Sequence, residues 1–186
     1  MDEIVLAAMR KWPNVPHCFG WLALDARGDW YLRDEAAQRA GPFPRVKGSR
    51  IEHDKLKAFI GRNYLADEAG HWFFQNGPQR VYVQLEVAPW IWRLDGPAGR
   101  PTITSHTGRP AQLRSPWLDD DGRVFLDTTL GFGLVHSQDM GLAAQAVEIG
   151  HWAPMPLHFD DAPARFGYRL DPQPSMSTPA PAHDRS

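Results

Sequence analysis

Three loops built on the same plan constrain the fold of this chain more than any other feature of its sequence. In each loop an Asp stands three residues before a Gly, and a bulky pair follows the residue after that Gly. The Asp can accept a hydrogen bond from the backbone two residues on, the Gly allows a positive φ, and the bulky residues begin a strand. The loops are Asp25–Gly28, Asp67–Gly70 and Asp119–Gly122, followed by Trp30-Tyr31, Trp72-Phe73 and Val124-Phe125. Three copies predict a fold made of repeated hairpin-plus-helix units.

Length and charge limit the class of protein. A chain of 186 residues is expected to form one globular unit or two small lobes that share a core. Its net charge of -2 provides no general attraction to nucleic acid or to an anionic membrane, so we expect it to bind neither. The single cysteine, Cys18, excludes an internal disulfide framework, and the acidic start Met1-Asp2-Glu3 is unlike a secretory signal. No apolar run approaches the ~20 residues that span a bilayer, and we expect a cytoplasmic protein.

The first half of the sequence predicts two helices among several strands. Residues 2–12 have the apolar spacing of a short amphipathic helix. Ser49 and Glu52 match a capping box, which predicts a helix from there to about Arg62. Strands are expected at 18–24, 29–33, 81–87 and 90–94, and the segment 34–48 is interpreted as a loop.

The second half repeats this scheme. Ser137 is expected to cap a helix that ends near Glu148. Strands are expected at 101–105, in a hairpin over 112–127, and in two short closing strands at 152–159 and 165–170. We therefore predict an α+β protein of two similar, packed β-plus-helix halves, residues 1–95 and 96–171. Residues 172–186 are rich in Pro, Ser and Ala and offer almost no apolar side chains, which predicts a disordered tail.

No pattern of catalytic or metal-binding residues stands out in the sequence. His17 and Cys18 are adjacent, and the other histidines lack the spacing of metal ligands. The acidic run Asp119–Asp121 lacks the alternating ligands and the twelfth-position Glu of an EF-hand. There is neither a Gly-x-Ser-x-Gly elbow nor a Gly-rich phosphate loop. We therefore expect no metal and no cofactor, and we assign no catalytic residue.

The polar segment 74–80, between two strong strands, is the best candidate for ligand contact. Its side chains Asn76, Gln79 and Arg80 can present amides and a guanidinium to a small anion or a peptide. Trp90 can stack the apolar part of such a ligand, and Arg62 is a companion if its helix packs back on the sheet.

Each of these residues also has a structural interpretation. Asn76-Gly77 is typical of a hairpin turn, and tryptophans such as Trp90 are more often core residues in a compact β-rich protein. Arg80 and Glu86 lie six residues apart, on the same face of an expected strand, and a buried pair between them would make both structural.

The order and spacing of several motifs resemble the proteobacterial domain-of-unknown-function family 1285, or a closely related family of uncharacterised proteins. The motifs are Gly28–Tyr31, Gly48–Ile51, Phe59-Ile60, Asp67–Phe73, Pro78–Val81 and Glu86–Trp90. The match covers residues 18–94 well and the second half more loosely; the segment 34–47 and the residues after 170 depart from it. The resemblance implies an α+β fold of repeated units, each with curled antiparallel strands and a packed helix. A role in signal transduction has been proposed for that family, and it provides no catalytic residues to carry over.

We expect a cytoplasmic binding or regulatory module without catalysis, whose partner is a small anionic ligand or a protein. The alternative is a small, hydrolase-like enzyme whose polar groups converge only in three dimensions. Nucleic-acid binding comes third because of the net charge. A cleft with several inward carboxylates or histidines would favour the enzyme, and a shallow groove with Trp and Arg would favour the module.

Overall fold

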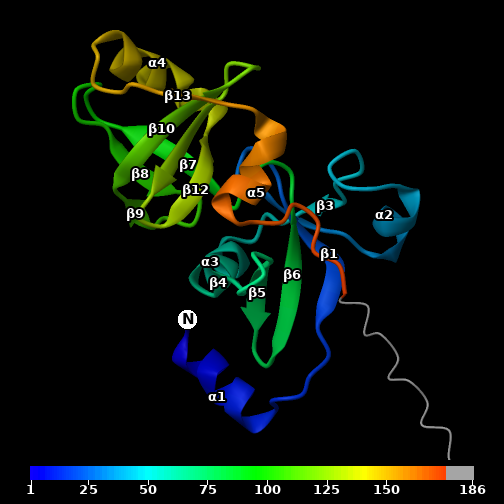
Figure 1. Cartoon of the computed structure of the whole chain (residues 1–186). Helices are drawn as coiled ribbons and strands as arrows, with labels where there is room; N and C mark the ends of the chain where they lie inside the picture. The colour runs from blue at the N-terminus through cyan, green and yellow to red at the C-terminus, as the bar shows by residue number, and fades with distance from the viewer. Residues whose placement is uncertain (175–186) are drawn as a thin grey trace, which may run out of the picture.

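Two β-sheets organise the protein. In the computed structural model, which describes residues 1–174, the first sheet has six strands and the second has seven. The first sheet contains β1 (Cys18–Leu24), β2 (Trp30–Leu32), β3 (Ser49–Arg50), β4 (Tyr64–Ala66), β5 (Trp72–Asn76) and β6 (Gln79–Leu85). The second contains β7 (Trp90–Asp95), β8 (Thr102–Ser105), β9 (Pro110–Ala111), β10 (Leu113–Asp119), β11 (Val124–Thr128), β12 (Gly131–Val135) and β13 (Met155–Leu157). Figure 1 shows the two sheets as separate lobes of one molecule.

The two sheets repeat one topology. The first has the order β3-β2-β1-β6-β5-β4, and the second has the order β9-β8-β7-β12-β11-β10, with β13 added outside β10. In each half the first strand pairs in parallel with the last strand of a three-strand meander: β1 with β6, and β7 with β12. The neighbouring pairs are antiparallel, apart from the added β13. The predicted α+β fold of two similar halves is confirmed.

The change from one sheet to the other occurs between β6 and β7, in residues 86–89. The sequence analysis predicted this division near residues 96–100. In the structure β7 belongs to the second sheet, although it lies within residues 1–95. The expected tail begins at residue 172, and all of it except residues 172–174 lies outside the described residues.

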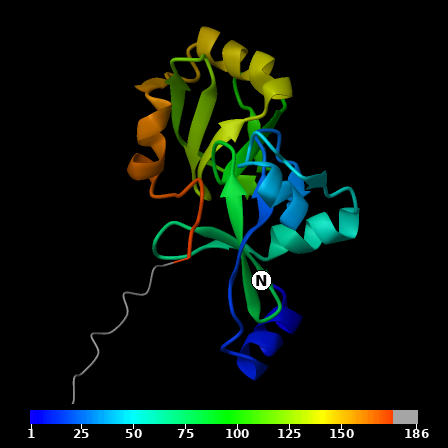
Figure 2. The same cartoon turned by 90° about the vertical axis from the view of Figure 1, so that its right-hand side faces the viewer.

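Helices cover parts of both sheets. They are α1 (Glu3–Lys11), α2 (Glu35–Ala40), α3 (Asp54–Arg62), α4 (Met140–Glu148) and α5 (Ala162–Phe166), with short 3-10 turns η1 (Ser137–Asp139) and η2 (Phe159–Asp161). α3 contacts β5 and α4 contacts β7, so each half has a helix packed on its sheet. α5 also packs on the second sheet, where Phe166 stacks on Phe132 of β12 at 3.8 Å. Figure 2 shows α4 at one end of the molecule and α1 at the opposite end.

The three predicted loops share one hydrogen-bond pattern. In each, the Asp Oδ1 accepts the backbone N–H groups two and four residues on, at 2.8–3.1 Å. The Gly has a positive φ, at +81° for Gly28, +81° for Gly70 and +76° for Gly122, as the sequence predicted. The Asp Oδ2 takes a basic partner: Lys47 Nζ at 2.9 Å on Asp25, His71 Nδ1 at 3.2 Å on Asp67, and Arg123 Nε at 2.7 Å on Asp119.

A fourth loop follows the same plan with Ser in place of Asp. Ser105 Oγ accepts the N–H of Arg109 at 3.1 Å, and Gly108 donates to the Ser105 carbonyl at 2.8 Å with φ +83°. The hydroxyl replaces the carboxylate as acceptor but has no second oxygen for a basic partner.

The predicted capping box is wrong. Ser49 and Arg50 form β3, paired antiparallel with Leu32 and Tyr31, because sheet pairing satisfies the backbone groups that a helix start would leave free. α3 begins later, and the N-terminal cap is His53, whose Nδ1 accepts the N–H of Leu56 at 3.3 Å.

Three further elements differ from expectation. The expected loop 34–48 contains α2, because Asp34 Oδ1 caps it by accepting the N–H of Ala37 at 2.9 Å. The expected closing strand 165–170 overlaps α5, which ends at Phe166 and is capped by Gly167 in the left-handed conformation. Ser137 opens the 3-10 turn η1, and its cap is His136, whose Nδ1 accepts the N–H of Gln138 at 3.1 Å.

The core is rich in aromatic side chains at the junction of the halves. Trp90 and Trp92 share one face of β7 and stack at 5.9 Å. Their indole N–H groups donate to the carbonyls of Leu130 and Leu126, at 2.9 and 3.1 Å. The expectation that most tryptophans anchor the core is confirmed for both residues.

Candidate functional site

Arg80 lies at the start of β6, on the face of the first sheet that also carries Tyr82. Side chains two residues apart on a strand share a face, and the register places Gln75 opposite Arg80 and Phe73 opposite Tyr82. The Arg80 guanidinium carbon lies 4.5 Å from the centre of the Phe73 ring. Within residues 1–174, no carboxylate forms an ion pair with Arg80.

The expected competitor for Arg80 is engaged elsewhere. Glu86 Oε2 accepts the N–H of Ala26 at 3.0 Å and lies 3.3 Å from Lys47 Nζ. Lys47 also bonds Asp25 Oδ2 at 2.9 Å. Glu86 therefore belongs to the cluster around the first loop. It does not pair with Arg80, which is the condition that the proposed role of Arg80 in ligand binding requires.

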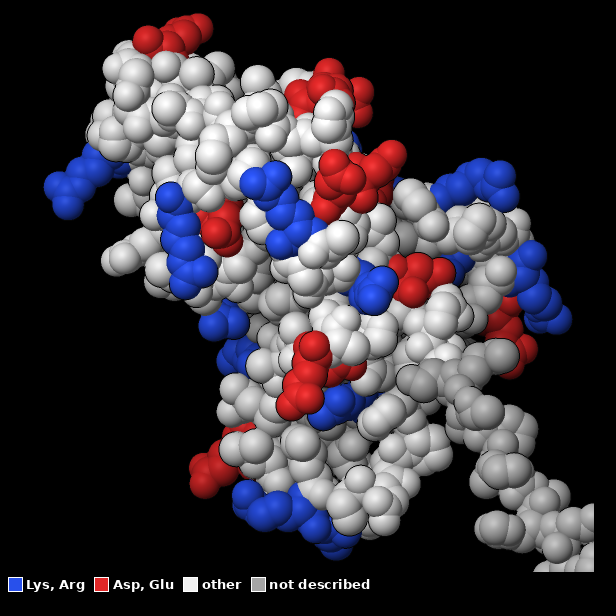
Figure 3. Space-filling model, in the orientation of Figure 1, with Lys and Arg blue, Asp and Glu red and all other residues white. Residues whose placement is uncertain are grey.

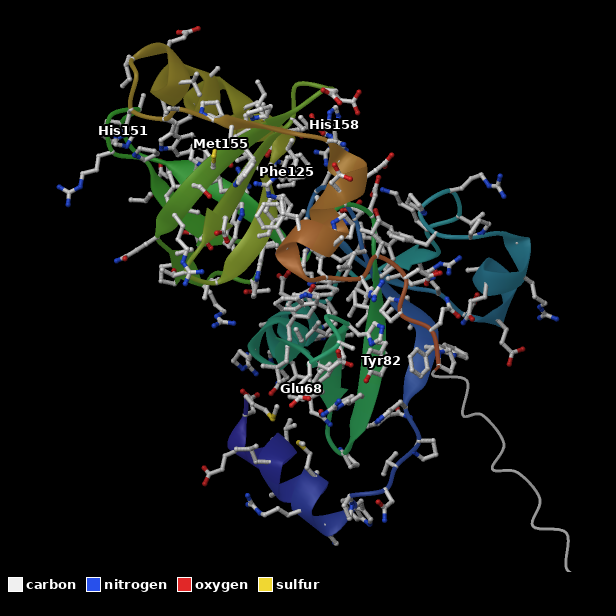
Figure 4. All side chains as sticks on the ribbon, in the orientation of Figure 1. Glu68, Tyr82, Phe125, His151, Met155 and His158 are labelled. Atoms are coloured by element: carbon white, nitrogen blue, oxygen red, sulfur yellow. The ribbon has the colours of Figure 1, made fainter. Side chains whose placement is uncertain are left out.

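A cavity of about 380 Å³ opens beside Tyr82 on the same face. Its walls are His17, Phe19, Asp67, Ala69, His71, Tyr82, Gln173 and Pro174. Phe19 stacks on Tyr82 at 4.5 Å, and the imidazoles of His17 and His71 meet the Tyr82 ring edge-on at 5.8 and 5.9 Å. Figure 4 shows Tyr82 on β6 in the first half, away from Phe125 and His158 of the second half.

The carboxylate in this cavity is already saturated with hydrogen bonds. Asp67 Oδ1 accepts the N–H groups of Ala69 and His71, and Oδ2 takes the Tyr82 hydroxyl and His71 Nδ1, both at 3.2 Å. Burial opposes ionisation of Asp67, but these hydrogen bonds and the nearby imidazole outweigh it and lower its pKa. Asp67 is therefore ionised, and both of its carboxylate oxygens are occupied by hydrogen-bond partners within the protein.

The parallel pairing of β1 and β6 brings Arg80 next to this cavity. Cys18 lies opposite Val81, which places His17 beside Arg80. Gln79 Nε2 donates to the carbonyl of Pro16 at 3.0 Å and ties the start of β6 to the segment that precedes β1. One guanidinium, two imidazoles and a phenol thus lie along a single face.

The other predicted site residues do not join this group. Arg62 is bound to Asp2, with Nε–Oδ1 at 3.0 Å, and Asn76 lines a different, mostly apolar cavity that also contains Trp21 and Leu56. Trp90 is buried, with 1% of its surface exposed, and is not a stacking platform for a ligand. Asn76 ends β5 and pairs with Gln79 rather than with Arg80, so alternation along the strands places Asn76 and Arg80 on opposite faces. The Trp90 side chain points into the core.

Sequence reasoning missed His17, His71 and Tyr82. They come from three segments that only the register of β1, β5 and β6 brings together. A partial signal was present: His71 follows the second loop at the position where Arg123 follows the third, which marks it as the partner of Asp67.

Charge is mixed over the visible surface. Figure 3 shows Lys and Arg interspersed with Asp and Glu, with no extended area of one sign on this face.

Within the described part of the chain, no group of three or more His, Cys, Asp or Glu side chains is placed to hold a metal ion. Among residues 1–174 no helix has the length and apolar character needed to cross a bilayer.

Comparison with known proteins leads to uncharacterised families. The family model DUF2944, described as "Protein of unknown function (DUF2946)", matches residues 1–173, and the comparison with curated proteins found no match. A DUF1285 family protein from Silicibacter pomeroyi DSS-3 is similar, with 12% identity, TM-score 0.46, and coverage of 76% of this chain and 82% of that chain. A DUF1285 family protein from Shewanella baltica OS155 has 16% identity, TM-score 0.46, and coverage of 67% and 91%. The expected likeness to that family or a closely related uncharacterised one is confirmed.

Proposed function

The chain belongs to the DUF2944 family of proteins of unknown function, and we propose that it is a binding module for a small anion that carries an aromatic ring. One observation carries the proposal: the Arg80 guanidinium has no carboxylate partner within residues 1–174 and lies on the same face as an aromatic-walled cavity. The module is proposed to act in a regulatory, cytoplasmic role, with the ligand as its signal.

The chemistry of the face fits this ligand class. A guanidinium donates two parallel hydrogen bonds to a carboxylate or phosphate, and its position over Phe73 leaves the edge of the guanidinium free for such bonds. The rings of Phe19, Tyr82 and His17 provide a wall against which a planar group can pack. A volume of about 380 Å³ is sufficient for a small ligand.

The test compares ligands that carry an aromatic ring, a negative charge, or both. Indole-3-acetate and phenyl phosphate carry both ring and charge; indole lacks the charge, and acetate and inorganic phosphate lack the ring. We expect calorimetry to show binding of at least one of the first two, and about tenfold weaker binding for Arg80→Gln, since a charge-assisted pair is lost.

Arg114→Gln is the matched control, because Arg114 is an exposed strand residue of the second sheet. It removes the same charge and should leave binding unchanged. Equal binding by the Arg80 and Arg114 variants, or no binding of any aromatic anion, would overturn the proposal.

A hydrolase-like enzyme is the second candidate, favoured by one observation. His71 Nδ1 lies against Asp67 Oδ2 in a cavity that also holds His17, an arrangement that can orient an imidazole as a general base. The equivalent contact in the other two loops is made by Lys47 and Arg123, which supports a structural purpose for the pair. Hydrolysis of p-nitrophenyl acetate by the protein that is lost in His71→Gln would favour the enzyme; equal rates would favour the module.

A further inference from the structure

Another cavity, of about 270 Å³, lies where one loop from each half meets the start of α4. Ala26 and Arg27 come from the first loop, and Arg123 follows Gly122 of the third. We propose that this cavity binds a short aliphatic monocarboxylate. The site is separate from the Arg80 face, and the inference does not depend on the proposed function.

The interior of the cavity is apolar. Leu134 and Val135, at the end of β12, and Met140, at the start of α4, form much of its wall. The volume is below the ~300–1,000 Å³ of sites for drug-sized ligands, and none of the lining residues is aromatic. A short, flexible alkyl chain fits such a space, and the lining offers no aromatic side chain on which a ring could stack.

The charge at the cavity is positive and available. Arg27 is exposed and forms no ion pair with any residue that the structure describes. Arg123 is held by Asp119 at 2.7 Å and reaches Asp121 at 3.6 Å, so its charge is compensated. A carboxylate on the ligand would therefore pair with Arg27.

Ser137 adds a hydroxyl to the lining. It is the first residue of η1, and its Oγ makes no hydrogen bond within residues 1–174. An apolar wall with one cation and one hydroxyl donor at its edge is complementary to a fatty carboxylate, whose two ends differ in the same way.

A ligand in this position would stabilise the arrangement of the two halves. Its walls come from both halves, so a bound ligand would contact both sheets at once. A ligand that binds only the assembled arrangement stabilises it by mass action. We therefore expect the ligand to raise the thermal midpoint of the protein.

The test is a titration of the ¹⁵N-labelled full chain with hexanoate, followed by NMR. We expect amide shifts at Arg27 and at residues 134–137. Binding of hexan-1-ol, which lacks the charge, and of acetate, which lacks the chain, should each be about tenfold weaker. Arg27→Gln should weaken hexanoate about tenfold, whereas Arg100→Gln, at an exposed position outside the cavity, should not.

Ala26→Leu provides a second, independent variant. The larger side chain would fill the cavity without altering its charge, and it should also weaken hexanoate. The inference is overturned if hexanoate does not bind, if Arg27→Gln binds as tightly as Arg100→Gln, or if the shifts instead gather around Tyr82 or around Trp21 of the separate apolar cavity.

Discussion

The buried His106 should make the protein lose stability in mild acid. Its Nδ1 accepts the N–H of Ile91 at 3.3 Å, so the ring proton lies on Nε2, which has no hydrogen-bond partner. The ring is surrounded by Trp30, Tyr64 and Trp90, with centroid distances of 5.4, 5.9 and 5.8 Å. Burial lowers the pKa of His106 from 6.5 to about 3, and the charge of Asp25 only partly opposes this.

The sign and size follow from linkage. The unfolded chain takes up a proton at His106 below pH 6.5, whereas the folded protein does so only near pH 3. The contribution of neutral His106 to the free energy of unfolding is therefore fully present above pH 6.5, and it is lost as the pH falls from 6.5 toward 3. At about 1.4 kcal/mol for each pKa unit, the full loss is about 5 kcal/mol, comparable with the total stability of a small domain.

The assay is urea unfolding of the protein and of His106→Phe at several pH values between about 5 and 6.5, where most carboxylates are already ionised. At neutral pH the substitution should have little effect, because relief of the unpaired Nε2 offsets the acceptor lost by the Ile91 N–H. The dependence of unfolding free energy on pH should become much shallower. Some slope will remain from His136, whose pKa burial also lowers.

His151→Phe serves as the control, because His151 is exposed and its loss should leave the pH dependence unchanged. A His106→Phe variant with the same slope as the parent protein would refute the reasoning.

Three further predictions concern the fold. Gly122→Ala should cost about 1–2 kcal/mol from its positive φ alone, whereas Gly70→Ala should cost clearly more in urea unfolding, because its Cβ would also meet the backbone of residues 167–168. Equal costs would contradict this. Arg33 is buried and donates to the carbonyls of Val46 and Gly41 and to Gln84, so Arg33→Met should destabilise by at least about 2 kcal/mol. A loss of less than about 0.5 kcal/mol, the size expected for an exposed residue, would show that segment 34–46 does not depend on Arg33. Truncation after Pro174 should leave the thermal midpoint unchanged, and a fall of several degrees would show that residues 175–186 contribute to stability.

Local chemistry made the loops predictable. An Asp, a Gly and the intervening residues determine their own hydrogen bonds, so the three turns could be placed without knowledge of the sheet. The capping box at Ser49 failed because its competitor was distant in sequence: the edge of β2 offered Ser49 and Arg50 a pairing that the local pattern does not contain. The same limit explains why the strand predicted at 165–170 overlaps α5.

The candidate site was only partly accessible to the same reasoning. Arg80 could be selected because it is a cation between two strong strands. The condition that it should not pair with Glu86 is met, because Glu86 bonds Ala26 instead. Trp90 was grouped with it on proximity in sequence, but β6 separates the two residues and Trp90 packs in the core. His17 joins Arg80 through a parallel pairing between strands some sixty residues apart, and no spacing in the sequence encodes that register.

The most direct test of the account is an NMR titration of the ¹⁵N-labelled chain with indole-3-acetate. If the face around Arg80 binds aromatic anions, the amides of His17, Phe19, His71 and Tyr82 should shift together and saturate, and Arg80→Gln should need about tenfold more ligand to reach the same shifts. Shifts confined to another surface, or shifts around Tyr82 that persist unchanged in Arg80→Gln, would contradict the account.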